Sequence, residues 1–213
     1  MTNHFNIMTD IDGVKHYDLT NTIQYLEYKG KQNYGSSFKI HAIDYEVIYQ
    51  LLSWIVYDKK ACTKYALHPD KGILLIGPVG CGKTSLMNLI SPLLTKKRAF
   101  IIKPARNITI EFSKEGYDVI NRYSRSIRSP VALCLDDIGV EPPMRYFGDH
   151  INVIGEVLLS RYDLFRSTQI LTHGTSNLDA DEMENRYGHR VRSRLREMFN
   201  MISYDSRSPD KRC

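Results

Sequence analysis

The sequence predicts an α/β fold in three layers, with helices covering both faces of a mainly parallel five-stranded sheet. Short apolar segments of strand length alternate along the chain with segments of helical spacing, as in a parallel sheet whose strands are joined by helices. A glycine-rich loop lies directly between the first apolar segment and a helix candidate. The predicted strands are residues 73–76, 99–103, 131–136, 169–173 and 201–204.

The composition is that of an ordinary globular protein. At 213 residues, with 42% hydrophobic and 25% charged residues, the chain is long enough for one α/β domain. No apolar run approaches the roughly 20 residues that cross a bilayer, and the first residues lack a secretory pattern, so we expect a cytoplasmic protein without a membrane partner. The four cysteines have no metal-ligand spacing, which argues against a zinc site. A net charge of +5 is compatible with an anionic partner but does not require one.

Three regions are expected along the chain. Residues 1–37 are polar with little periodicity and are interpreted as a flexible N-terminal arm. Residues 38–205 form the single domain, which opens with an amphipathic helix whose apolar stripe runs from Ile43 to Val56. Residues 206–213 form a C-terminal tail. Further helices are predicted to begin at Lys83, Lys114, Asp149, Asp179 and His189.

The segment GPVGCGKT, residues 77–84, matches the phosphate-binding pattern G-x-x-x-x-G-K-[ST]. It lies after a strand and before a helix, which disfavours a chance match. Its glycines allow backbone angles that a Cβ would obstruct, so that N–H groups can surround phosphate oxygens. Lys83 is expected to contact the β- and γ-phosphates of ATP, and the Thr84 hydroxyl to bind Mg²⁺. The predicted nucleotide contacts are Gly77, Pro78, Val79, Gly80, Cys81, Gly82, Lys83, Thr84 and Ser85.

Two carboxylates end the apolar strand in VALCLDDIG, residues 131–139. At the C-terminal end of a parallel strand beside the phosphate loop, Asp136 is expected to hold the magnesium ion. Asp137 is expected to orient or polarise the attacking water. The alternative is a pair of acids that face solvent at a strand end.

Another apolar strand with a polar end follows in QILTHGTSNL, residues 169–178. If this strand lies between the phosphate-loop strand and the acidic strand, Asn177 faces the γ-phosphate, with Thr175 and Ser176 as helpers. The alternative is that Asn177 and Asp179 end the strand and cap the next helix.

Five arginines fall within eleven residues of the last segment: Arg186, Arg190, Arg192, Arg194 and Arg196. Such a run is usually a solvated helix face. Guanidinium groups also stabilise charge on a transferring phosphoryl group, in the same subunit or from a neighbour.

The ordered set GPVGCGKT, LCLDDIG, THGTSNL and YGHRVRSRLREM resembles the DnaC/IstB-like branch of the AAA+ ATPases, a P-loop NTPase family of the ASCE type that includes helicase loaders and transposition helpers. The resemblance covers roughly residues 38–205. It is strongest to the short DnaC-like ATP-binding proteins of Bacteroides-type bacteria and their mobile elements.

The resemblance implies an ATPase whose nucleotide lies between adjacent subunits of a homo-oligomer. Residues 77–84 match Walker A, Asp136 and Asp137 match Walker B, and Asn177 matches sensor 1. Arg194 matches the arginine finger that enters a neighbour's site, with Arg190 as second choice. Such proteins form helical or ring-like assemblies, and many bind single- or double-stranded DNA and act on a replicative helicase or a transposase.

The sequence departs from the family pattern in two ways. The Walker B pair is Asp-Asp where many relatives have Asp-Glu, so slow hydrolysis is expected. Only eight residues follow Asp205, so we expect neither a C-terminal lid domain nor the sensor-2 arginine that such a lid carries. Lys211 or Arg212 could take the place of that arginine, but no motif supports either.

Two further functions stay open at this point. One is a nucleotide-dependent assembly module with little turnover, and the less favoured is a P-loop kinase for a small molecule. A DNA-binding stripe is also expected at Arg122, Arg125 and Arg128, with an exposed helix end as the alternative.

Overall fold

The computed structural model describes residues 5–12, 14–96, 98–124 and 131–212. Its central sheet has five strands in the order β4-β5-β8-β3-β9, and every neighbouring pair is parallel. The predicted α/β fold with a five-stranded parallel sheet is confirmed, and β8 lies between β3 and β5 as the predicted site requires. The strands are β3 (Gly72–Ile76), β4 (Phe100–Pro104), β5 (Ala132–Ile138), β8 (Thr172–Ser176) and β9 (Phe199–Ser203).

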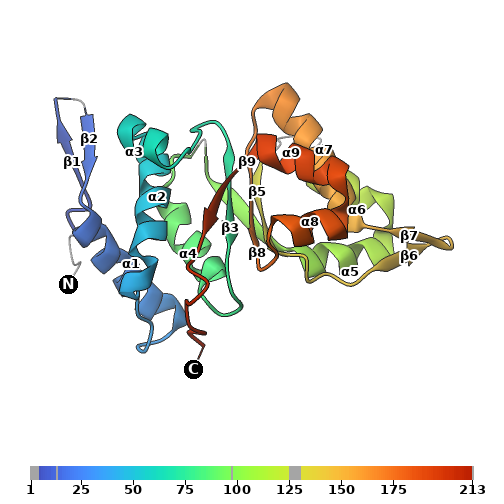
Figure 1. Ribbon diagram of the computed structural model, residues 1–213, viewed down its shortest axis with the longest axis horizontal. Coiled ribbons are helices and arrows are strands. Elements are labelled where there is room, and N and C mark those ends of the chain that lie inside the picture. The colour runs from blue at the N-terminus through green and yellow to red at the C-terminus, as the bar shows by residue number, and fades with distance from the viewer. Residues whose placement is uncertain (1–4, 13, 97, 125–130, 213) are drawn as a thin grey trace.

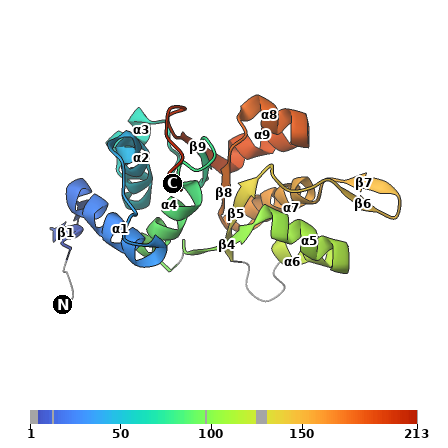
Figure 2. The same ribbon diagram turned by 90° about the horizontal axis from the view of Figure 1, so that it is seen from below.

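Helices cover both faces of this sheet, with α1 to α4 on one side and α5 to α9 on the other (Figures 1 and 2). The first group is α1 (Leu19–Tyr34), the short 3₁₀ helix η1 (Ala42–Asp44), α2 (Tyr45–Val56), α3 (Lys59–Lys64) and α4 (Lys83–Ile90), which continues into η2 (Ser91–Leu93). The second group is α5 (Ala105–Glu115), α6 (Tyr117–Ser124), α7 (Val153–Thr168), α8 (Ala180–Tyr187) and α9 (His189–Met198).

The core lies between the sheet and these helices. Every residue of β3 and β8 is buried, which fits central strands covered on both faces. His173 of β8 is fully buried, and burial lowers its pKa to about 3, so the ring is neutral. Its Nδ1 accepts a hydrogen bond of 3.1 Å from the Ile73 backbone N–H. This contact ties β8 to the strand that carries the phosphate loop.

The N-terminal segment differs from the expected flexible arm. A hairpin of β1 (Met8–Ile11) and β2 (Val14–Tyr17) precedes α1, and the Asp18 side chain caps α1 by accepting from Asn21 N–H. Leu26 is 0% exposed, and α1 packs against α2 and α4. The apolar face of α1 is short and partly aromatic, so its periodicity is weak in the sequence.

Two predicted helix starts are wrong. The helix expected at Lys114 begins at Ala105, and Gly116, at φ 62°, separates it from α6. The helix expected at Asp149 begins at Val153, where the Asn152 side chain accepts from Gly155 N–H. Asp149–Ile151 is instead β7, which pairs with β6 (Met144–Tyr146) in a hairpin that projects from the body of the molecule (Figure 2).

After β9 the described chain, residues 204–212, forms neither helix nor strand and turns back along the phosphate loop. Across the described residues, no helix is long and apolar enough to cross a membrane.

Candidate nucleotide site

The phosphate loop leaves the buried strand β3 and ends where α4 begins at Lys83. Gly80 and Gly82 have φ angles of 79° and 99°, in the left-handed region that favours glycine. The backbone conformation of the loop therefore favours glycine at these two positions of the phosphate-binding pattern. The N-terminal end of α4 carries unpaired N–H groups and a partial positive charge at the loop, which suits phosphate.

Lys83 lies against the loop it follows. Its side chain is almost entirely buried, and Nζ donates to the carbonyl oxygens of Gly77 and Pro78, both at 2.8 Å. These bonds fix the ammonium group inside the curve of the loop, where it lines the cavity described below.

Asp136 joins the phosphate loop to β8. Its Oδ1 accepts from the Thr84 hydroxyl at 2.8 Å and from the Thr175 hydroxyl at 2.7 Å. The Thr175 oxygen in turn accepts from Asp137 N–H at 2.8 Å. A hydroxyl and a carboxylate that converge in this way are oxygen ligands suited to Mg²⁺, which keeps several waters and uses few protein groups. No group of three or more His, Cys, Asp and Glu side chains with metal-binding geometry occurs among the described residues.

Asp137 reaches the same cavity because the strand is irregular there. Successive strand residues normally point to opposite faces. Between Leu135 and Ile138 the pairing of β5 with β8 shifts register, and Asp137 has a φ of 55°. Burial and the neighbouring Asp136 raise the pKa of the Asp137 carboxyl, while the charges of Lys83 and Arg212 partly lower it. A carboxylate with a raised pKa is a better proton acceptor than an ordinary aspartate.

Asn177 also lines the cavity, directly after β8. The competing role of helix capping belongs to Asp179, whose side chain accepts from the N–H groups of Asp181 and Glu182. Of the two expected helpers, Thr175 contacts Asp136, whereas Ser176 donates to the Ile138 carbonyl at 2.6 Å and supports the strand.

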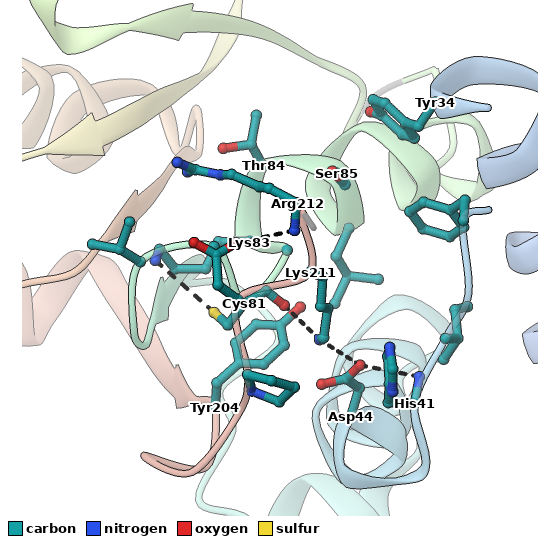
Figure 3. A pocket seen from close by; sticks show the side chains of 18 of the residues that line it. Tyr34, His41, Asp44, Cys81, Lys83, Thr84, Ser85, Tyr204, Lys211 and Arg212 are labelled. Carbon is teal, nitrogen blue, oxygen red and sulfur yellow. Dashed lines mark hydrogen bonds and ion pairs between the residues drawn. The ribbon is translucent and has the colours of Figure 1, made fainter.

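The cavity has a volume of about 910 Å³, enough for a nucleoside triphosphate. One end is formed by the phosphate loop from Val79 to Ser85, with Asp137 and Asn177. The other end is apolar and aromatic: Phe38 is part of the lining, and so is Tyr34, which Figure 3 labels. Flat apolar side chains of this kind suit a nucleobase. Of the predicted contacts, Gly77 and Pro78 lie beside the cavity through their bonds to Lys83 and are not part of its lining.

Two parts of this cavity were not placed by any sequence motif. Residues 34–48 supply the aromatic end together with His41 and Asp44, and residues 204–212 supply Tyr204, Lys211 and Arg212. The segment FKIHAID before the first amphipathic helix was a usable signal for the former, because aromatic and apolar residues cluster there without a strand or helix pattern. Of the latter, Lys211 and Arg212 were considered only as substitutes for a sensor-2 arginine, with no motif in support, and no local signal marked Tyr204.

Arg194 and Arg190 lie on α9, and neither lines the cavity of its own chain. The Arg194 guanidinium lies 4.9 Å from the centre of the Tyr162 ring, a cation–π contact. Among the other arginines of this segment, Arg186 pairs with Glu141 and Arg192 with Glu184 and Asp181. Within the described part of the chain, Arg190 and Arg194 form no ion pair.

Of the three arginines expected to form a DNA-binding stripe, only Arg122 lies among the described residues. Arg122 forms ion pairs with Glu111, at 3.3 Å, and with Glu115, which occupy its guanidinium group. Arg125 and Arg128 lie outside the described residues.

Comparison with known proteins agrees with this geometry. The family model described as AAA domain (dynein-related subfamily) matches residues 72–187, more than half of the chain. The chain belongs to the AAA domain family. The predicted resemblance to AAA+ ATPases is thereby confirmed, and with it a P-loop fold that binds nucleotide.

Three known proteins are similar to parts of this chain in sequence or in fold. The proteasome-associated ATPase of Geodermatophilus obscurus is 30% identical over 95 residues, which are 43% of this chain and 16% of that protein. The chain thus matches about a sixth of the length of that relative. The crystal structure of a candidate primosome component from Streptococcus pyogenes serotype M3 is 21% identical with a TM-score of 0.54, over 79% of this chain and 83% of that chain. This likeness concerns the fold. The crystal structure of the DnaC helicase loader is 20% identical with a TM-score of 0.47, over 70% of this chain and 89% of that chain.

Proposed function

We propose that this AAA domain protein hydrolyses ATP with Mg²⁺ and is of the DnaC/IstB-like type. The observation that carries the proposal is that Lys83, Thr84, Asp137 and Asn177 line a single cavity, with Asp136 held beside it by the hydrogen bond from Thr84. These groups lie at the C-terminal ends of three neighbouring parallel strands, at one edge of the sheet. The strands are β3, which leads into the P-loop, β8 and β5. We assign the ATPase domain to residues 38–205, with the N-terminal helix docked on it.

Each group has a distinct role. The loop amides and Lys83 hold the β- and γ-phosphates, and Thr84 and Asp136 would hold Mg²⁺, which would supply positive charge to the phosphates. Asp137 orients the attacking water and polarises its O–H bond. Asn177 holds that water, or an oxygen of the γ-phosphate, by a hydrogen bond. The aspartate at position 137 is shorter than a glutamate, so we expect slow turnover.

In this proposal a neighbouring subunit contributes a further cation to the site. Charge that develops on the transferred phosphoryl group is stabilised by a guanidinium in related chemistry. Arg194 is our assignment for that role in a neighbouring subunit, with Arg190 as second choice, because both lie away from their own cavity and form no ion pair among the described residues. The protein therefore assembles as a homo-oligomer through its nucleotide site.

Mixed variants test this arrangement. Lys83→Ala is expected to lose nucleotide binding, and Arg194→Ala to keep binding but lose turnover. Each variant alone then has no working site, whereas a mixture pairs an intact P-loop from one chain with an intact finger from the other and regains turnover. Full turnover of Arg194→Ala at every protein concentration would contradict the finger assignment. ATP-dependent assembly with negligible turnover of the wild type would instead favour a non-catalytic assembly module.

The order of the four motifs supports a role as a DNA-associated helper, such as a replicative helicase loader or a transposition helper. Fluorescence anisotropy with single- and double-stranded oligonucleotides, with and without ATP, tests the DNA part of this proposal. We expect binding that strengthens with ATP and weakens steeply with salt. Equal anisotropy with and without protein at low salt would contradict it.

A further inference from the structure

The segment after β9, residues 204–212, packs onto the phosphate loop of the same chain; we name it the C-terminal strap. Its first residue, Tyr204, donates a backbone hydrogen bond of 2.8 Å to Ile76, and Lys211 N–H donates to the Gly80 carbonyl at 3.0 Å. A Cβ at Gly80 would lie 2.0 Å from Oδ1 of Asp210. The strap thus lies close against the loop at Gly80, where the left-handed backbone favours glycine.

Lys211 joins three separate segments. Its Nζ lies 2.6 Å from Oδ2 of Asp44 and 2.6 Å from the carbonyl oxygen of Cys81 (Figure 3). The side chains are 16% and 7% exposed for Lys211 and Asp44, so solvent screens this ion pair little. Asp44 belongs to η1, in the segment that supplies the aromatic end of the cavity. The ammonium group therefore holds the phosphate loop at a fixed distance from the segment that forms the aromatic end of the cavity.

Arg212 is the next residue and also lines the cavity. Its backbone is fixed by a hydrogen bond of 3.0 Å to Oδ1 of Asp210, and its side chain extends across the loop toward Thr84 in the view of Figure 3. Its guanidinium forms no ion pair within the described residues, which leaves its donors available to an anion.

We propose that the C-terminal strap is part of the nucleotide site of its own chain. Lys211 positions the phosphate loop against η1, and Arg212 donates hydrogen bonds to the terminal phosphate of a nucleoside triphosphate. The inference rests on the proposed function, because it assumes that ATP occupies the cavity. Lys211 is a positioning residue, whereas Arg212 contacts the ligand.

A comparison of ATP and ADP binding distinguishes the role of Arg212 from that of Lys211. Affinities of the full chain for a fluorescent non-hydrolysable ATP analogue and for fluorescent ADP are measured with Mg²⁺. Arg212→Gln is expected to weaken the ATP analogue about fivefold to tenfold and ADP less than about twofold, because only the terminal phosphate loses a charge-assisted contact. Lys211→Met is expected to weaken both nucleotides about tenfold, since it disturbs the loop that holds the phosphates common to both.

Arg207→Gln is the matched control. Arg207 lies on the same strap, is exposed, pairs with Asp205 at 2.6 Å and does not line the cavity, so both affinities should stay at the wild-type value. If Lys211→Met unfolds at the assay temperature, the measurement is repeated with Lys211→Met combined with Asp44→Asn, which removes the unpaired buried carboxylate. The same loss of affinity is expected there.

The outcomes are distinguishable from a failure of the proposed function. A wild-type chain that binds neither nucleotide would overturn both proposals. If the wild-type chain binds both nucleotides, and Arg212→Gln weakens the affinities for ATP and ADP equally or changes neither, the phosphate contact alone is overturned. Wild-type affinities in both Lys211 variants would overturn the positioning role.

Discussion

Replacing Thr175 by valine tests whether one hydroxyl organises both carboxylates of the site. Thr175 is completely buried, donates to Asp136 at 2.7 Å and accepts from Asp137 N–H at 2.8 Å. Valine has nearly the same shape, so packing is retained and both hydrogen bonds are lost. A bond to a charged group contributes about 1.5–3 kcal/mol and a neutral one about 1 kcal/mol, so we expect the free energy of unfolding to fall by about 2–4 kcal/mol.

Urea unfolding measures this loss, and ATP turnover measures its consequence for the site. We expect Thr175→Val to unfold at clearly lower urea and to hydrolyse ATP at least about tenfold more slowly, because Asp137 loses the anchor of its irregular backbone. Thr175→Ser, which keeps the hydroxyl and loses one methyl group, should cost only about 1 kcal/mol and keep most turnover. Wild-type stability and turnover of Thr175→Val would refute the view that this hydroxyl positions the two acids.

Three further predictions concern other parts of the molecule. Leu26→Ala should lower the free energy of unfolding by about 2–4 kcal/mol in urea titrations if α1 is docked, whereas Gln24→Ala on its exposed face should change it little. Asp137→Asn should raise the melting temperature at pH 7, because it removes a carboxylate whose pKa is raised in the folded state. This gain in melting temperature should shrink as the pH is lowered toward that pKa, because the wild-type carboxyl then becomes protonated. A gain that stays constant with pH would contradict this prediction. Tyr162→Ala should slow turnover about twofold to fivefold by releasing Arg194, whereas Tyr162→Phe, which keeps the ring, should not; equal rates in both variants would argue against the cation–π contact.

Much of the site could be predicted from the sequence because its parts are local. The phosphate loop, the paired acids and Asn177 each lie at a strand end, and a parallel sheet brings such ends to one edge. The sequence left open whether the strand before Asn177 lies between the other two, and the structure places β8 between β3 and β5.

The missing parts depend on contacts between distant residues. Lys211 and Asp44 are 167 positions apart, and nothing in either neighbourhood indicates the other. The irregularity at Asp137 arises from pairing with β8 and leaves no mark in LCLDDIG. The docking of α1 likewise depends on a surface formed by α2 and α4, so its weak periodicity gave the wrong interpretation of a flexible arm.

The position of Arg212 has a practical consequence for anyone who handles this protein. An affinity tag or fluorescent protein placed directly after Arg212 would start beside the candidate nucleotide cavity, and a polyhistidine tail there would bring metal-binding rings beside the proposed Mg²⁺ site. The turn between β6 and β7 is a safer point for a dye or an insertion. Phe147 is 93% exposed there, and a Cβ at Gly148 would meet no atom within 4 Å.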